Sequence, residues 1–259
     1  MTTRFHEKPG ISPSNRSLER GIEILRAFRP GSSLLGNGEL AERTGLSRST
    51  VSRLTQTLVG TGLLELDAAT RTYRLNAAVL SLGHAMRSGS VVLQKAAPLM
   101  KAVAEAHRVN VGLATADRDE MVYLESIRYN RRIALRNVVS GQRVPIELTS
   151  LGYAYLAAAG DARRRLLFGV FKARRGPEWP ALRRRIESAI VQVHEQRWCV
   201  ASWQPEVVAL ATPIVIEGLP VHALNMSVSS AEEPMAVARE LKGKLLRLGA
   251  AITKAIEAA

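Results

Sequence analysis

The sequence predicts a two-domain α+β protein, in which a small, mainly helical domain precedes a larger domain of helices packed on a mixed sheet. Three observations predict this architecture. A helix-turn-helix pattern followed by a short hairpin occupies residues 37–75. After residue 91, strand-like runs alternate with long helical segments. The length of 259 residues accommodates one domain of roughly 75 residues and a larger one.

The helix-turn-helix pattern begins with a short helix over residues 38–43. It breaks at Gly45, because glycine readily adopts the left-handed conformation that ends a helix. Ser47 then caps a second helix that runs to about Gly60. The apolar residues of this second helix are spaced i, i+3, i+7 on one face, and they are Val51, Leu54 and Leu58.

A hairpin is predicted directly after the second helix. Strand-like runs at 63–66 and 72–75 enclose a polar turn at 67–71. A helix-turn-helix followed by such a hairpin is a winged helix-turn-helix, and we place this domain at residues 16–75.

The polar face of the second helix has the chemistry of a DNA-reading surface. Short hydroxyl side chains let a helix sit deep in a major groove, while Arg and Gln donate to phosphates and base edges. An ordinary solvated face would mix charges, but no Asp or Glu lies between Ser47 and Gly62. The predicted DNA-binding residues are Arg48, Ser49, Thr50, Ser52, Arg53 and Gln56 on the helix and Arg71 in the hairpin turn.

The charge balance also indicates a polyanionic partner. Lys and Arg number 36 against 23 Asp and Glu, a formal net charge of +13. Basic runs at 163–165, 172–175 and 183–185 lie far from the helix-turn-helix. We interpret these runs as solvated helix faces, with a second DNA site as the alternative.

The sequence offers no catalytic or metal-binding constellation. The five histidines are scattered without ligand spacing, and no nucleophile signature or Gly-rich phosphate loop is present. The single cysteine, Cys199, excludes an intramolecular disulfide and follows Trp198 at the expected end of a helix, where it is interpreted as a core residue rather than a reactive thiol. We therefore expect no enzyme activity, metal or cofactor.

The amino terminus does not resemble a signal peptide, and no apolar run approaches the roughly 20 residues that span a bilayer. One cysteine fits a reducing compartment. These features predict a soluble cytoplasmic protein without a membrane partner.

Two segments flank the winged domain. Residues 1–15 are rich in Thr, Ser, Pro and Gly and are expected to form a flexible arm before a helix capped by Ser17. Residues 76–90 are predicted to contain an apolar linker helix over 77–86. This helix is too apolar for solvent and belongs to neither domain; the alternative is that it packs on its own winged domain.

The larger domain is placed at residues 91–259. Its predicted strands are 110–116, 120–127, 133–139, 207–216 and 220–229. Its predicted helices are 91–107, one starting in 148–152 and ending at 159, 162–168, 181–197 and 232–258. Strands interrupted by long helices predict a mixed antiparallel sheet with helices packed on it, an α+β domain.

The chain resembles an IclR-family transcriptional regulator. The resemblance is carried by residues 18–25 (LERGIEIL), 49–54 (STVSRL), 62–64 (GLL) and 73–75 (YRL), and it continues weakly to the carboxyl terminus. It implies a linker helix used for dimer contacts, a GAF-like carboxy-terminal domain that binds a small effector, and a homodimer or homotetramer on palindromic DNA.

The resemblance also implies positions for effector binding. Val144, Ser150 and Leu151 match the pocket-forming turn of the family, and Ala209, Asn225 and Ser227 match effector-facing strand positions. Ile133 and Arg136 match loosely, with Arg136 as an anion partner. Trp203 is expected at the pocket rim, with a core position as the alternative.

Departures from the family bear on the ligand. Tyr153 stands where many relatives have Lys, residues 145–147 read Pro-Ile-Glu instead of Pro-Leu-His, and 202–205 replace a usually acidic segment. Fewer charged groups and a Trp suit an aromatic or other apolar organic acid better than a small keto acid.

The sequence therefore predicts a ligand-responsive transcriptional regulator of catabolic genes that responds to a small organic, aromatic acid. Coupling between its two sites would pass through the linker helix. The alternative is a stand-alone small-molecule sensor or hydrolase whose winged domain makes protein contacts.

Overall fold

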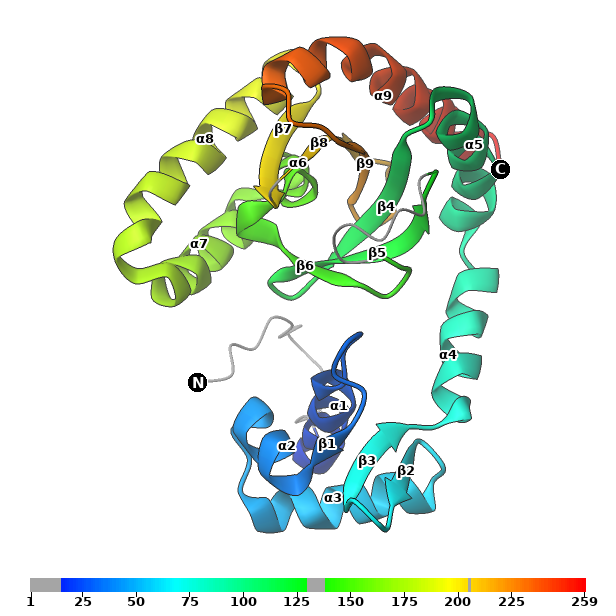
Figure 1. The fold of residues 1–259 in the computed structure, drawn as a ribbon, viewed down its shortest axis with the longest axis vertical. Helices are drawn as coiled ribbons and strands as arrows, with labels where there is room; N and C mark the ends of the chain where they lie inside the picture. The colour runs from blue at the N-terminus through cyan, green and yellow to red at the C-terminus, as the bar shows by residue number, and fades with distance from the viewer. Residues whose placement is uncertain (1–14, 130–137, 205) are drawn as a thin grey trace. The chain divides into compact units, whose positions relative to one another are not determined.

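The computed structural model describes residues 15–129, 138–204 and 206–259 (Figure 1). The chain forms two compact units, and the boundary lies between Gly89 and Ser90. The arm expected at 1–15 lies outside the described residues except for Asn15. The side chain of Asn15, rather than Ser17, caps the first helix by accepting hydrogen bonds from the backbone N–H groups of Ser17 and Leu18.

The first unit is a winged helix-turn-helix, as the sequence predicts. Its helices and strands are α1 (Arg16–Ala27), β1 (Leu35–Gly36), α2 (Asn37–Thr44), α3 (Arg48–Gly60), β2 (Leu64–Asp67), β3 (Thr72–Leu75) and α4 (Ala77–Ser88). The antiparallel sheet has the order β1-β3-β2. The sequence analysis missed β1, because two residues are too short to show an alternating pattern.

Local chemistry sets the angle between α2 and α3. Gly45 ends α2 with a φ of +69°, and Ser47 Oγ accepts a hydrogen bond of 3.3 Å from the Thr50 N–H to begin α3. The apolar face of α3 is buried, so the polar face is directed to solvent. The core of this unit consists of Ile24, Ala27, Phe28, Leu35, Leu40, Val51, Leu54, Leu58, Leu64 and Tyr73.

Helix α4 contrasts with the other helices of this unit. Asn76 caps it, but none of its residues is buried in the described structure. Leu80 is 77 % exposed, Leu82 63 % and Met86 52 %. The alternative that this helix packs on its own winged domain therefore has no buried side chain to support it.

The second unit is an α+β domain. Its elements are α5 (Val91–His107), β4 (Asn110–Asp117), β5 (Glu120–Ile127), β6 (Arg143–Pro145), η1 (Ile146–Leu148), α6 (Ser150–Ala158), α7 (Asp161–Arg175), η2 (Gly176–Glu178), α8 (Trp179–Gln196), β7 (Cys199–Gln204), β8 (Val207–Ile214), β9 (His222–Ser229) and α9 (Pro234–Glu257). The antiparallel sheet has the order β6-β5-β4-β9-β8-β7.

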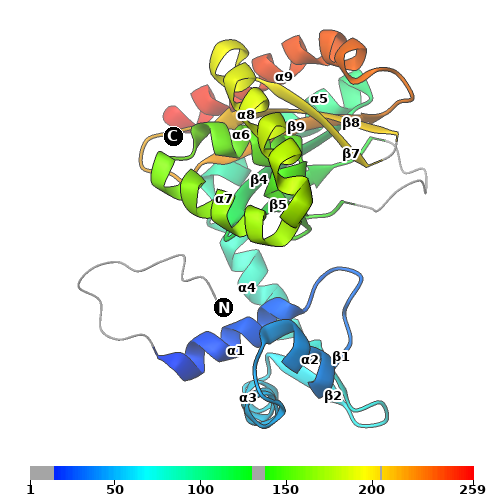
Figure 2. The same ribbon diagram turned by 90° about the vertical axis from the view of Figure 1, so that its left-hand side faces the viewer.

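The sheet lies between two helical layers (Figure 2). Helices α5 and α9 cover one face, where Leu113, Leu210 and Met226 are fully buried against them. Helix α6 covers the other face, with α7 and α8 in the same layer. Because side chains alternate along a strand, Asn225 points to the α6 side, where its strand partner Gly112 leaves space. This face carries the polar groups described below.

Three strand predictions need correction. The sequence analysis missed β6 and β7 and placed Cys199 just after the end of a helix predicted at 181–197. In the structure α8 ends at Gln196, Arg197 takes the left-handed conformation, and Cys199 opens β7. The thiol is fully buried, as expected for a core residue, and burial raises its pKa to about 12. Of the strand predicted at 133–139, residues 133–137 lie outside the described residues, and Val138 and Val139 have no regular structure.

The first residue of β9, His222, makes the stability of this unit depend on pH. His222 is 6 % exposed, and burial lowers its pKa, opposed by a hydrogen bond to the Pro220 backbone. The unfolded chain therefore binds more protons than the folded one as pH falls below the ordinary histidine value of about 6.5. Stability is fully present above that pH and is lost as pH falls toward the lower folded-state pKa.

We expect the unfolding midpoint of the second unit to fall with pH below about 6.5, and His222→Gln to flatten that dependence. Tryptophan fluorescence measures this directly, because Trp179, Trp198 and Trp203 all lie in the second unit. His107→Gln is the control, because His107 is exposed. Equal pH slopes in the parent and the His222 variant would contradict the assignment.

Candidate functional site

The polar face of α3 presents most of the predicted DNA-binding residues to solvent. Arg48, Ser49, Arg53 and Gln56 are exposed, and Thr50 and Ser52 are half-buried. The hydroxyls of Ser49 and Thr50 lie 3.1 Å and 2.9 Å from Ser47 Oγ, which ties them to the start of the helix. The surface that remains is long, cationic and free of carboxylates.

The hairpin of the first unit is a compact turn with a basic tip. Asp67 Oδ1 accepts hydrogen bonds from the N–H groups of Ala69 and Thr70, which shape the turn. Arg71 is exposed there at a φ of +53°. Arg74, by contrast, pairs with Glu65 across the strands at 2.5 Å. Arg71 is thus placed as a wing residue that is available for a phosphate.

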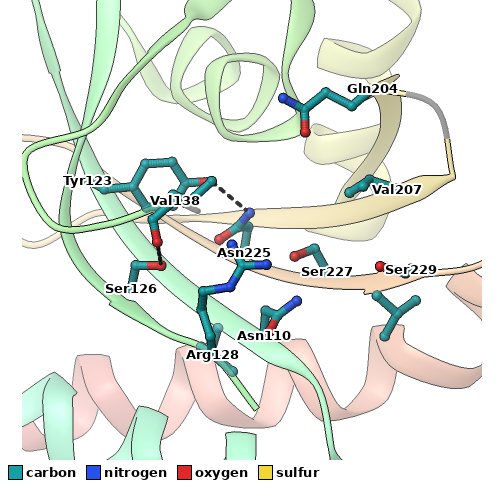
Figure 3. A pocket seen from close by; sticks show the side chains of 12 residues that line it. Asn110, Tyr123, Ser126, Arg128, Val138, Gln204, Val207, Asn225, Ser227 and Ser229 are labelled. Carbon is teal, nitrogen blue, oxygen red and sulfur yellow. Dashed lines mark hydrogen bonds between the residues drawn. The ribbon is translucent and has the colours of Figure 1, made fainter. Parts of the chain in front are cut away.

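The second unit has a small pocket, partly open to solvent, on the α6 face of the sheet (Figure 3). It lies where β4 begins and where β5, β7 and β9 end. Its lining residues are Asn110, Val111, Tyr123, Ser126, Arg128, Val138, Gln204, Val207, Asn225, Ser227, Val228 and Ser229. The lining combines valines with polar side chains and therefore offers contacts to both the apolar and the polar part of a small molecule.

The inner part of the pocket is built around Gly112. A Cβ at this position would lie 2.5 Å from both the Tyr123 ring and the Asn225 amide, so only glycine leaves room for them. Asn225 Nδ2 donates a hydrogen bond of 3.3 Å to the Tyr123 hydroxyl (Figure 3). Burial raises the pKa of Tyr123 to about 12, while the Asn225 hydrogen bond and the Arg128 charge oppose the rise. The phenol is therefore protonated at neutral pH.

The structure adds Arg128 as a residue that the sequence analysis missed. It directly follows β5, and its side chain points into the pocket toward Asn225 (Figure 3). A single Arg at the end of a predicted strand gives no sequence signal. The expected anion partner Arg136, together with Ile133, lies outside the described residues.

The other predicted effector residues are placed as follows. Asn225 and Ser227 line the pocket, and Ala209 is the buried cross-strand partner of Ser227. Trp203 is half-buried on β7 and belongs neither to the pocket lining nor to the buried core. The residues Val144, Ser150 and Leu151 are buried around the start of α6 and do not line this pocket.

The start of α6 is held by a tight corner. Thr149 Oγ1 accepts a hydrogen bond of 3.2 Å from the Gly152 N–H and donates one of 2.9 Å to the Pro145 carbonyl. Gly152 lies so close to η1 that a Cβ would be 1.9 Å from the Ile146 oxygen. Glycine is therefore required at this position.

A buried ion pair connects the same corner to α7. Glu147 is fully buried, and its Oε1 accepts hydrogen bonds from Arg174 Nη1 at 3.2 Å and from Arg175 Nη2 at 2.7 Å. Arg174 also pairs with Asp119. The interpretation of the basic runs as solvated faces is therefore wrong for Arg174 and Arg175, which balance a buried carboxylate instead.

Two further observations limit the chemistry. Among the described residues, no group of three His, Cys, Asp or Glu side chains is arranged to hold a metal ion. No helix in the described ranges has both the length and the apolar character needed to cross a membrane.

Two family models match the sequence. The IclR helix-turn-helix domain matches residues 17–68. The model described as the bacterial transcriptional regulator IclR C-terminal matches residues 84–253. Together they cover both units of the structure.

Individual relatives agree with these matches. The HTH-type transcriptional regulator TsaQ1/TsaQ2 of Comamonas testosteroni is 33 % identical over 89 % of this chain and 84 % of its own length. The Pca regulon regulatory protein of Pseudomonas putida is 30 % identical over 82 % of this chain and 73 % of its own.

Solved structures give the same result. An IclR family transcriptional regulator from Brucella abortus has a TM-score of 0.84 at 32 % identity, covering 93 % of this chain and 92 % of that one. An IclR homolog from Microbacterium hydrocarbonoxydans, complexed with 4-hydroxybenzoate, has a TM-score of 0.69 at 22 % identity, covering 94 % and 100 %. The second likeness shows the fold alone.

Proposed function

Because this chain belongs to the IclR family of DNA-binding transcriptional regulators, we propose that a small organic acid, aromatic in character, binds its second unit and thereby controls catabolic genes. The observation that carries this proposal is the pocket on the α6 face of the sheet. Its valines provide contacts for the apolar part of a ligand, and Tyr123, Asn225 and Ser227 provide hydrogen-bonding groups for the polar part. The similarly folded IclR homolog from Microbacterium hydrocarbonoxydans was solved in complex with 4-hydroxybenzoate, which supports the aromatic class.

The first unit would act on palindromic operator DNA in the cytoplasm, as a homodimer or homotetramer. One reading helix spans only a few base pairs, so a two-fold symmetric assembly is needed to read two half-sites. The exposed apolar residues of α4 supply a surface for contacts between subunits. We propose that the chain divides into an arm at 1–15, a DNA-binding domain at 16–75, a linker at 76–90 and an effector domain at 91–259.

A stand-alone sensor or hydrolase is not favoured, because the relatives of this chain are named as transcriptional regulators. Such a protein would hydrolyse a small ester or amide and leave no specific DNA footprint.

The proposal is tested by footprinting and by titration of the operator in the presence of acids. We expect the full chain to protect a palindromic site near its own gene, and an aromatic acid to change operator affinity about 5- to 150-fold, the usual range of coupling between two sites. Benzoate-like acids should act at lower concentrations than short keto acids. Operator affinity that no acid of either class changes would contradict ligand control, and the absence of a footprint would contradict the DNA site.

A further inference from the structure

The unusual group in the pocket is the Arg128 guanidinium. Its Nε is buried and has no hydrogen-bond partner in the part of the chain that the structure describes. Within the described residues, Arg128 has no ion pair or hydrogen bond, although it is half-buried. A cation that has lost water on one side without gaining a partner is unfavourable. The positive charge and the N–H donors of Arg128 are therefore available to an anion.

No carboxylate among the described pocket residues pairs with Arg128. None of the pocket-lining residues is an Asp or Glu. On the same strand, Glu125 Oε1 accepts hydrogen bonds from the Ser126 N–H at 3.0 Å and from Ser140 Oγ at 3.2 Å. The following residues 130–137 read NRRIALRN and contain no acid. Neither the described pocket lining nor residues 130–137 supply a negative charge for Arg128, which leaves this charge to a ligand.

Neutral donors lie near the same point. Since Asn225 Nδ2 donates to the Tyr123 oxygen, the phenol hydrogen is left to be donated elsewhere. Ser227 lies two residues further along β9, on the same face as Asn225, and also lines the pocket. Hydrogen bonds from neutral donors strengthen when the acceptor is charged. Arg128 and these groups together form a donor set that fits an anionic oxygen pair.

We infer that Arg128 is the anion-binding and specificity-determining residue of this pocket, and that the ligand is a monocarboxylate whose charged group pairs with the guanidinium and accepts a hydrogen bond from the Tyr123 hydroxyl. This inference rests on the proposed function and assigns its ligand chemistry. The described lining holds one charged side chain, which matches a single negative charge better than a phosphate dianion. Val138 and Val207 would contact the apolar remainder of the ligand.

The test is calorimetric titration of the full chain with benzoate, benzamide and inorganic phosphate. Benzamide keeps the shape of benzoate but lacks its charge. We expect the parent to bind benzoate and to bind benzamide and phosphate much more weakly. Arg128→Gln should weaken benzoate binding about 10- to 150-fold, the usual range for a hydrogen bond to a charged group, and leave benzamide affinity nearly unchanged. Arg128→Lys should lie between the two.

Arg108→Gln is the matched control, because Arg108 is exposed, contacts the Tyr129 ring and does not line the pocket. Benzoate affinity that is equal in the parent and in Arg128→Gln would overturn the inference while leaving ligand control intact. Parent protein that binds no carboxylate from an aromatic and aliphatic panel would overturn both. Unfolding followed by tryptophan fluorescence identifies a variant that is misfolded. If Arg128→Gln is misfolded, the benzoate affinity of Arg128→Lys tests the inference in its place.

Discussion

Gly152→Ala is expected to destabilise the second unit by about 3 kcal/mol or more, at the upper end of overpacking effects. The added Cβ would lie 1.9 Å from the Ile146 oxygen and 2.5 Å from its carbonyl carbon, and these are backbone atoms. Helix α6 has little room to shift, since all residues from Ser150 to Ala157 are buried. The measurement is urea unfolding followed by tryptophan fluorescence, which reports on this unit only.

Gly160→Ala provides the control for that experiment. Gly160 caps α7 at a φ of −61°, and a Cβ there would meet nothing within 4 Å. Its effect should stay within about 1 kcal/mol. If both variants unfold at the urea concentration of the parent, the close approach of α6 to η1 is wrong.

The combined variant Arg48→Ala, Arg53→Ala is expected to lose most operator affinity. Each Arg that contacts a base edge contributes about 1 to 3 kcal/mol, so two independent contacts give about 2 to 6 kcal/mol. A phosphate contact instead lowers the salt dependence of binding and weakens all sequences alike. Titration of operator and unrelated DNA at two salt concentrations separates these cases.

Arg184→Ala is the matched control for charge, because Arg184 is an exposed arginine on α8 in the second unit. It should change operator affinity little. Operator binding by the double variant that equals that of the parent would show that α3 is not the reading helix.

The sequence was most informative where structure depends on near neighbours. Gly45, Ser47 and the apolar spacing of α3 lie within fourteen residues of one another, so the helix-turn-helix could be predicted closely. The α+β class of the second unit was also predicted correctly. Strand β7 was missed, because its residues CVASWQ lack a clear alternation and its hairpin pairing with β8 is irregular between Ala201 and Gln204.

The pocket depends even more on contacts between residues that are distant in the sequence. Asn225 and Ser227 were named through resemblance to a family, while Arg128 was not. The significance of Arg128 depends on the lack of a hydrogen-bond partner for its Nε among the described residues and on the shifted register between β4 and β5 after Leu113. No local sequence pattern reveals either feature. Likewise, a basic run shows that Arg174 and Arg175 are charged, but only the fold brings Glu147 to them.

The exposure of α4 has a consequence for helix–coil thermodynamics. Helices of fewer than roughly 12 to 15 residues are marginal in water unless tertiary contacts stabilise them. Helix α4 has 12 residues and no buried side chain in the described structure. Its helical population therefore depends on whatever surface covers Leu80, Leu82 and Met86. If a second copy of the chain covers them, folding of α4 and association of the subunits form a single equilibrium. Protein concentration then sets how much of α4 is helical, and therefore how stiff the connection between the two units is.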